Sequence, residues 1–147
     1  MNMFRREFLA ASAAGLASTP LLAGRGTGRR RPRVAAIYTV FTYRSHAHVL
    51  LENFLQPYLF NGQLTDPGVD LVSFYRDQSP DGDMTDDVSK HYGIPVYKSI
   101  REALCQGGDK LAVDAVLSIG EHGSYPKTDL GQTMYPRKRF FDQILQV

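Results

Sequence analysis

The chain has 147 residues, enough for one domain with a substantial core and no more. Its formal net charge of +2 comes from the N-terminal segment. Without the seven arginines and one glutamate of residues 1–33, the totals of 17 basic and 15 acidic residues fall to 10 and 14, a net charge of about −4. Nucleic-acid binding, which needs positive charge on the folded part, is therefore excluded, and the single cysteine, Cys105, excludes an intrachain disulfide.

The first 32 residues have the pattern of an export leader followed by a basic linker. Arg5 and Arg6 precede a polar residue, a Phe and a Leu, which is the core of the twin-arginine signal. The apolar segment 9–23 is too short and too weakly hydrophobic for a spanning helix, and further arginines follow it. We expect the twin-arginine translocase as a partner during export, a periplasmic or extracellular location and no permanent membrane span. The alternative is a chance Arg-Arg pair before an amphipathic helix.

The next part of the chain predicts two strands and one helix. Residues 33–40 (RVAAIYTV) are β-branched and aromatic without a helical period, which is typical of a buried parallel strand. Ser45 can cap a helix over residues 46–58, whose apolar positions are spaced by three and four. Turn sequences such as Asn61-Gly62 then lead to a second strand over residues 69–75.

The rest of the chain continues the alternation. Thr85 and the two acids that follow it provide a cap and a negative first turn for a helix over residues 85–91, and Gly93 is placed to end that helix. The remaining elements are expected over residues 94–97 (strand), 99–106 (helix), 112–119 (strand) and 137–147 (helix), with an irregular segment over residues 120–136.

Strands that alternate with helices at this spacing predict right-handed βαβ units on a parallel sheet. The expected fold class is α/β: a Rossmann-like parallel sheet flanked by helices over residues 33–147. The sequence stops within an apolar helical pattern near Phe140 and Phe141, and no second sheet domain follows. We therefore expect an incomplete fold, the N-terminal domain of a longer chain whose C-terminal part is missing.

One stretch carries a resemblance to a known family. Between residues 85 and 120 a predicted helix runs into "HYGIPVY", then "SIREAL", a short gap with glycines and "VDAVLSIG". This order resembles the first domain of the glucose-fructose oxidoreductase / inositol dehydrogenase (Gfo/Idh/MocA) family. The resemblance implies an oxidoreductase-type domain that binds NAD or NADP, a small and sugar-like ligand, and a further C-terminal domain.

In open α/β sheets, ligands bind beyond the carboxyl ends of the strands. Asp77 stands where the family has the acid that holds a ribose, and Arg76 could favour a 2′-phosphate. The alternative for both is the start of a solvated loop. The residues expected to contact the cofactor are Thr39, Phe41, Arg44, Arg76, Asp77 and Gly120.

The chain departs from the family at two motifs. Segment 39–46 (TVFTYRSH) has no glycine at the place where a dinucleotide-binding loop has Gly-x-Gly-x-x-Gly. The Glu-Lys-Pro turn whose lysine assists catalysis in the family is also absent. The catalytic residues of the family therefore do not transfer to this chain.

The best candidates for catalysis are Glu121 and His122, which lie between two glycines directly after a predicted strand. The flanking glycines give this backbone conformational freedom. A carboxylate and an imidazole in such a segment suit general acid–base catalysis or metal binding. The alternative is structural: Glu121 caps a helix or pairs with Arg44, and His122 fills a turn. His46 and His48 could join them, but the spacing is not that of a zinc motif, so no metal-ligand set is predicted.

Three functions remain open at this point. The first is an exported Gfo/Idh/MocA-like oxidoreductase-type domain that binds a nicotinamide dinucleotide. The second is a non-catalytic domain of the same fold that binds a ligand or a partner. The third is a hydrolase or lyase, with or without a metal, that uses Glu121 and His122.

Overall fold

The computed structural model describes residues 30–147, so most of the predicted export leader lies outside the described residues. Four strands form one sheet in the order β5-β4-β1-β6, and a separate two-stranded sheet pairs β2 with β3. The strands are β1 (Arg33–Tyr38), β2 (Tyr58–Phe60), β3 (Gln63–Thr65), β4 (Asp70–Arg76), β5 (Val96–Tyr97) and β6 (Ala115–Ile119). The helices are α1 (His46–Leu55), α2 (Thr85–Tyr92), α3 (Ile100–Cys105) and α4 (Arg137–Leu145).

All pairings in the four-stranded sheet are parallel: β1 pairs with β4 on one side and with β6 on the other, and β4 also pairs with β5. Counted in chain order, these strands lie in the order 3-2-1-4, which is how the first four strands of a Rossmann sheet are arranged. The prediction of an α/β fold with a Rossmann-like parallel sheet flanked by helices is therefore confirmed.

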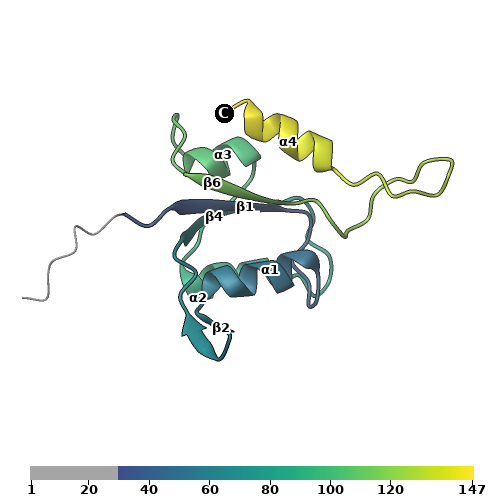
Figure 1. Ribbon diagram of the computed structural model, residues 1–147. Coiled ribbons are helices and arrows are strands. Elements are labelled where there is room, and N and C mark those ends of the chain that lie inside the picture. The colour runs from purple at the N-terminus through teal and green to yellow at the C-terminus, as the bar shows by residue number, and fades with distance from the viewer. Residues whose placement is uncertain (1–29) are drawn as a thin grey trace, which may run out of the picture.

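Helices cover both faces of the sheet, with α1 and α2 on one face and α3 and α4 on the other (Figure 1). Neighbouring side chains of a strand point to opposite faces. In β1, Ala36 and Tyr38 accordingly belong to the apolar cluster under α1 and α2. Ala35 and Ile37 belong to the cluster under α3 and α4, together with Phe140 of α4. The central strand thus supplies the core of both layers.

The helix predicted over residues 46–58 is shorter than expected, because α1 ends at Leu55 and Gln56 is already extended. Pro57 explains the early end, since a proline disfavours helical backbone in the residue before it. Tyr58 then enters an antiparallel hairpin of β2 and β3, which the prediction missed. Asn61 and Gly62 form its turn, both with positive φ (48° and 75°).

The capping predictions are largely confirmed. The side chain of Ser45 accepts the backbone N–H of His48 at the start of α1, and Ser99 caps α3 in the same way. Gly93 ends α2 in a left-handed conformation. The prediction that Thr85 caps α2 is wrong: it is buried, and the carboxylate of Asp83 accepts its backbone N–H at 3.0 Å.

Three strands are shorter than predicted. The first was predicted over residues 33–40, but β1 ends at Tyr38. Residues 94–97 contribute only Val96 and Tyr97 to the sheet, and residues 112–119 contribute only the part from Ala115 onward. The N–H of Ala112 bonds instead to the carbonyl of Leu104. No helix among residues 30–147 is long and apolar enough to cross a membrane.

Candidate functional site

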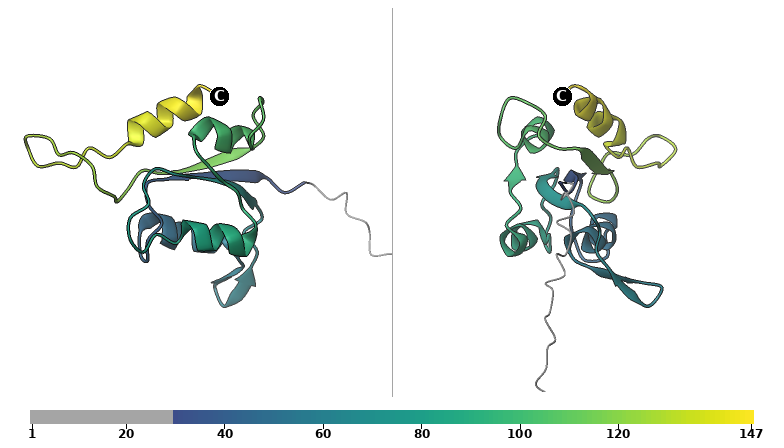
Figure 2. Two further views of the ribbon diagram at one scale, coloured as in Figure 1. Left: turned by 180° about the vertical axis from the view of Figure 1, so that it is seen from behind. Right: turned by 60° about the vertical axis from the view of Figure 1, so that its left-hand side comes forward.

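The strand order places a topological switch point between β1 and β6. The helix that follows β1, α1, packs on one face of the sheet, whereas the helix that follows β6, α4, packs on the other (Figures 1 and 2). The loops separate at such a point and leave a crevice beyond the carboxyl ends of the strands. An open hollow of about 440 Å³ lies there. Its lining residues are His46, Leu50, Ser118, Ile119, Gly120, Glu121, Arg137 and Phe141.

The floor of this switch-point crevice depends on a close approach of α4 to the end of β6. A Cβ added at Gly120 would lie 3.0 Å from Cγ and 3.4 Å from Cα of Arg137. Glycine at position 120 therefore allows Arg137 to sit directly over the strand end. The guanidinium of Arg137 pairs with the carboxylate of Glu121 at 2.5 Å, while 62% of the arginine side chain stays exposed.

Two histidines meet at one side of the crevice. Nδ1 of His46, the first residue of α1, lies 2.8 Å from Nε2 of His122. The ring centroids are 4.7 Å apart and the ring planes are inclined by 34°. The backbone of His122 is left-handed, with φ of 65°, a conformation that costs energy in residues other than glycine. Glu121 and His122 thus have different partners, Arg137 and His46.

The loop after β1 is fixed from within. The hydroxyl of Thr39, a buried residue, donates a hydrogen bond to the carbonyl of Glu121. Phe41 is buried and packs edge-on against Tyr38. Arg44 is exposed, and its guanidinium lies over the ring of Tyr43, 5.2 Å from the centroid. Three residues of this loop were predicted to contact the cofactor. In the structure, Thr39 and Phe41 are buried and stabilise the loop, whereas Arg44 is exposed to solvent.

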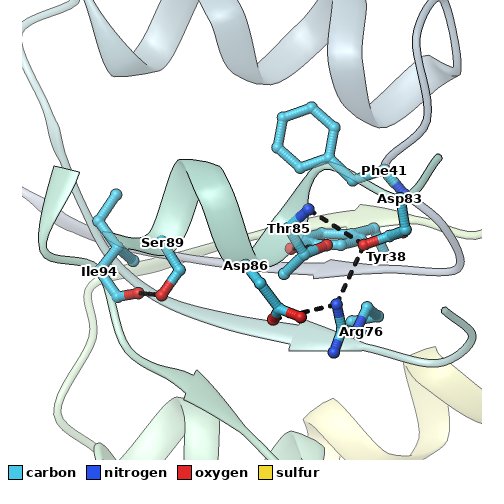
Figure 3. Close-up of polar contacts among 8 residues, drawn as sticks. All are labelled: Tyr38, Phe41, Arg76, Asp83, Thr85, Asp86, Ser89 and Ile94. Carbon is cyan, nitrogen blue, oxygen red and sulfur yellow. Dashed lines mark hydrogen bonds and ion pairs between the residues drawn. The ribbon is translucent and has the colours of Figure 1, made fainter. Parts of the chain in front are cut away.

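Arg76, the last residue of β4, joins a polar cluster on the side of α2 (Figure 3). Its Nη1 lies 3.1 Å from carboxylate oxygens of both Asp83 and Asp86. The carboxylate of Asp83, of which only 2% is exposed, also accepts the backbone N–H groups of Phe41 and Thr85. Burial alone would raise the pKa of Asp83, but these hydrogen bonds outweigh burial and hold the pKa below its ordinary value.

Asp77 lies at the centre of a second network. Its Oδ1 accepts the hydroxyl of Tyr75 at 2.8 Å, and its Oδ2 accepts the hydroxyl of Tyr125 at 2.7 Å and Nη2 of Arg139 at 2.6 Å. The side chain is 11% exposed. Burial alone would raise the pKa of Asp77, but its three partners outweigh burial and keep the pKa below its ordinary value. This Asp77 network ties the β4 end to the long β6–α4 loop and to α4.

Arg44, Asp77 and Glu121 were expected to line one common crevice. They all follow strands that run in parallel and so lie at the same edge of the sheet, but of the three only Glu121 lines the crevice. The structure brings Glu121 and Gly120 into the crevice and links Thr39 to them through the Glu121 carbonyl. Arg76 instead pairs with an aspartate of α2, and Asp77 is enclosed in the Asp77 network, so neither lines the crevice.

Sequence reasoning gave no defined role to two residues of α4. Arg137 lines the crevice and Arg139 belongs to the Asp77 network. The available signal is the run Arg137-Lys138-Arg139 at the start of the predicted helix, which is typical of a solvated helix start, an anion site or a contact to a further domain. Residues two apart on a helix do not share a face, which explains why these two arginines serve different sites.

Among the described residues, no group of three or more His, Cys, Asp or Glu side chains is placed to hold a metal ion. Comparison with family models, curated proteins and solved structures finds no match for this chain.

Proposed function

We propose that this chain is an exported Rossmann-like domain that binds an anionic small molecule in the switch-point crevice. The observation that carries the proposal is the hollow between β1 and β6, with the charged and polar side chains of Arg137, His46 and Glu121 beside an apolar wall. A concave, partly apolar site with a few convergent polar groups is the usual form of a small-molecule site.

An anion is favoured because of the donors at the crevice. Arg137 has five N–H donors, and its one described ion pair, to Glu121, leaves most of the side chain exposed. The N-terminus of α1, which begins at His46, adds the positive end of a helix dipole. A sugar acid or sugar phosphate combines such an anion with the sugar-like body that the Gfo/Idh/MocA resemblance implies.

The second candidate ligand is NAD or NADP, which the strand order 3-2-1-4 favours. The residues fit a dinucleotide poorly, however. Asp77 is enclosed by Tyr125 and Arg139, so a ribose would have to displace one of them. The loop after β1 holds no glycine, and Thr39 and Phe41 are buried. We therefore expect small anions to bind more tightly than the dinucleotides.

Isothermal titration and thermal shift test this proposal. The probes are inorganic phosphate, gluconate and glucose 6-phosphate, alongside oxidised and reduced NAD and NADP. We expect saturable binding of at least one small anion. Arg137→Gln should weaken it by a factor of about 10 to 150, since a charge-assisted hydrogen bond is worth about 1.5–3 kcal/mol.

Lys138→Gln is the matched control, because Lys138 is adjacent and equally charged but pairs with Asp142 along α4, outside the crevice lining. An equal loss in both variants would indicate non-specific attraction and would contradict the proposal. Tighter binding of a dinucleotide than of any small anion would favour the second candidate instead.

A further inference from the structure

The contact between His46 and His122 is not explained by the stability it provides. Both residues are exposed, where a single neutral hydrogen bond contributes only about 0.5–1.5 kcal/mol. Against this, the left-handed backbone of His122 costs about 1–2 kcal/mol. Strained backbone of this kind clusters at functional sites. The fold thus holds two imidazoles, 76 residues apart in the chain, nitrogen to nitrogen at a net gain close to zero.

The separation of the two nitrogens is close to that of two ligands on one metal ion. With metal–nitrogen bonds of about 2.0–2.1 Å, two tetrahedral ligand atoms lie about 3.3 Å apart. Nδ1 of His46 and Nε2 of His122 are 2.8 Å apart, so a small rotation of two exposed side chains would admit an ion. The centroid distance of 4.7 Å is shorter than rings in line end to end would require, so the nitrogens meet at an angle.

The other potential metal ligands near the two histidines already have partners, which sets the number of ligands that the protein can supply. Nδ1 of His48 accepts the backbone N–H of Arg44 at 3.2 Å, and its ring packs against Tyr43. The carboxylate of Glu121 is paired with Arg137. Two imidazoles therefore remain as protein ligands, and the other positions of an ion would be open to water or to a ligand in the crevice, which His46 lines.

We propose that His46 and His122 form a two-histidine site for a late first-row transition-metal ion. Imidazole nitrogen suits Cu²⁺, Ni²⁺ and Zn²⁺, and the general order of affinity puts Cu²⁺ first. The site shares His46 with the proposed anion site, but the metal proposal does not depend on anion binding, and an ion here would add positive charge at the crevice. It also differs from the sequence-based alternative that included Glu121 and His48.

Titration of the untagged full-length chain with Cu²⁺, Ni²⁺ and Zn²⁺, without any anionic ligand, tests the site. Electron paramagnetic resonance of the Cu²⁺ form should show one ion with two imidazole nitrogens. We expect His122→Asn and His46→Gln each to weaken binding by about tenfold or more, because one of two ligands is lost. Asparagine tolerates left-handed backbone, so His122→Asn removes the imidazole without adding strain.

His91→Gln is the control, since His91 is an exposed histidine of α2 that packs on Tyr92. Unchanged Cu²⁺ affinity in His122→Asn, or an equal loss in all three variants, would overturn the metal site. Arg137→Gln separates the two proposals, because it should weaken anion binding without weakening Cu²⁺ binding.

Discussion

At the scale of single residues, the role of Asp77 in the structure differs from the role that its sequence position predicts. Its position after the second sheet strand matches an acid that would hold a ribose. In the structure, hydroxyls of Tyr75 and Tyr125 and the guanidinium of Arg139 enclose its carboxylate. The same residue therefore anchors the β6–α4 loop and α4 against the end of β4.

Asp77→Asn should destabilise the fold. The substitution keeps the shape of the side chain but removes the charge that three donors share, and the expected loss in free energy of unfolding is about 2 kcal/mol. Tyr125→Phe removes one of these hydrogen bonds and should cost about 1 kcal/mol. Urea-induced unfolding followed by circular dichroism measures both losses.

Asp81→Asn serves as the control, because Asp81 is an exposed acid in the loop that follows Asp77. A change equal to that of Asp77→Asn would mean that net charge, rather than the Asp77 network, determines stability.

Residue roles in the crevice were only partly predictable. Gly120 and Glu121 could be placed there because they directly follow a recognisable strand. The pairing of His122 with His46 spans 76 residues and depends on how α1 sits against the end of β6. No local pattern encodes such a long-range contact. Likewise, whether an acid such as Asp77 is open to a ligand or enclosed depends on side chains from distant segments.

At the scale of elements, the long loop between β6 and α4 extends away from the sheet (Figure 2). Its first part is fixed to the loop after β4, because the side-chain amide of Gln78 bonds to both the carbonyl and the N–H of Ser124. Gly123, with φ of 93°, lies next to this contact. A Cβ there would lie 2.8 Å from Oε1 of Gln78 and 2.9 Å from Cε2 of Tyr125.

Gly123→Ala should therefore cost more stability than Gly131→Ala. Both glycines have positive φ, so both substitutions carry backbone strain of about 1–2 kcal/mol. A Cβ at Gly131 would meet no atom within 4 Å, whereas the one at Gly123 would clash. We expect an additional loss of about 1 kcal/mol at Gly123, measured as the difference between the two unfolding free energies. Equal losses would show that Gln78 and Tyr125 move aside freely.

Most elements were predictable because each is encoded locally. Serine caps at 45 and 99 and the glycine at 93 mark helix ends, and runs rich in apolar residues mark the buried strands. The hairpin of β2 and β3 was missed although its signal was present. Pro57 ends the helix, and Asn61-Gly62 between apolar residues is a strong hairpin turn. The helix prediction was too long because the helical spacing of apolar residues continues beyond Pro57, where the helix itself has ended.

At the scale of the whole molecule, the two enclosed aspartates predict sensitivity to acid. The pKa values of Asp77 and Asp83 lie below their ordinary values in the folded chain. A lowered folded-state pKa gives stability that is present above the unfolded-state pKa, about 3.9, and is lost as the pH falls through the folded-state value. Chemical unfolding at a series of pH values should thus show constant stability from pH 7 to about 5 and a decline below about 4.

The double variant Asp77→Asn and Asp83→Asn should flatten this decline, since its two sites no longer titrate. An equally steep decline in the double variant would place the acid sensitivity elsewhere.

Export is the other prediction for the whole molecule. Replacing Arg5 and Arg6 by lysine should abolish translocation, because the translocase recognises the arginine pair as an address. A reporter fused after residue 32, expressed in bacteria with and without the twin-arginine translocase, measures this. Export that persists in the lysine variant, or in cells without the translocase, would contradict the leader.

The overall arrangement was the most predictable level, because alternating strands and helices allow few right-handed parallel topologies. The strand order 3-2-1-4 follows from this rule together with one change of face after β5. Ligand chemistry was the least predictable, since it depends on which exposed groups stay free once the loops have packed against one another.

The position of β1 has a consequence for detecting ligands of unknown identity. Because this strand supplies both apolar clusters, its amide hydrogens should exchange with solvent deuterium only when both helix layers separate. The crevice lies between α1 of one layer and α4 of the other. A molecule that contacts both walls will thus slow isotope exchange throughout β1, and mass spectrometry of that one peptide can screen mixtures of metabolites for occupants.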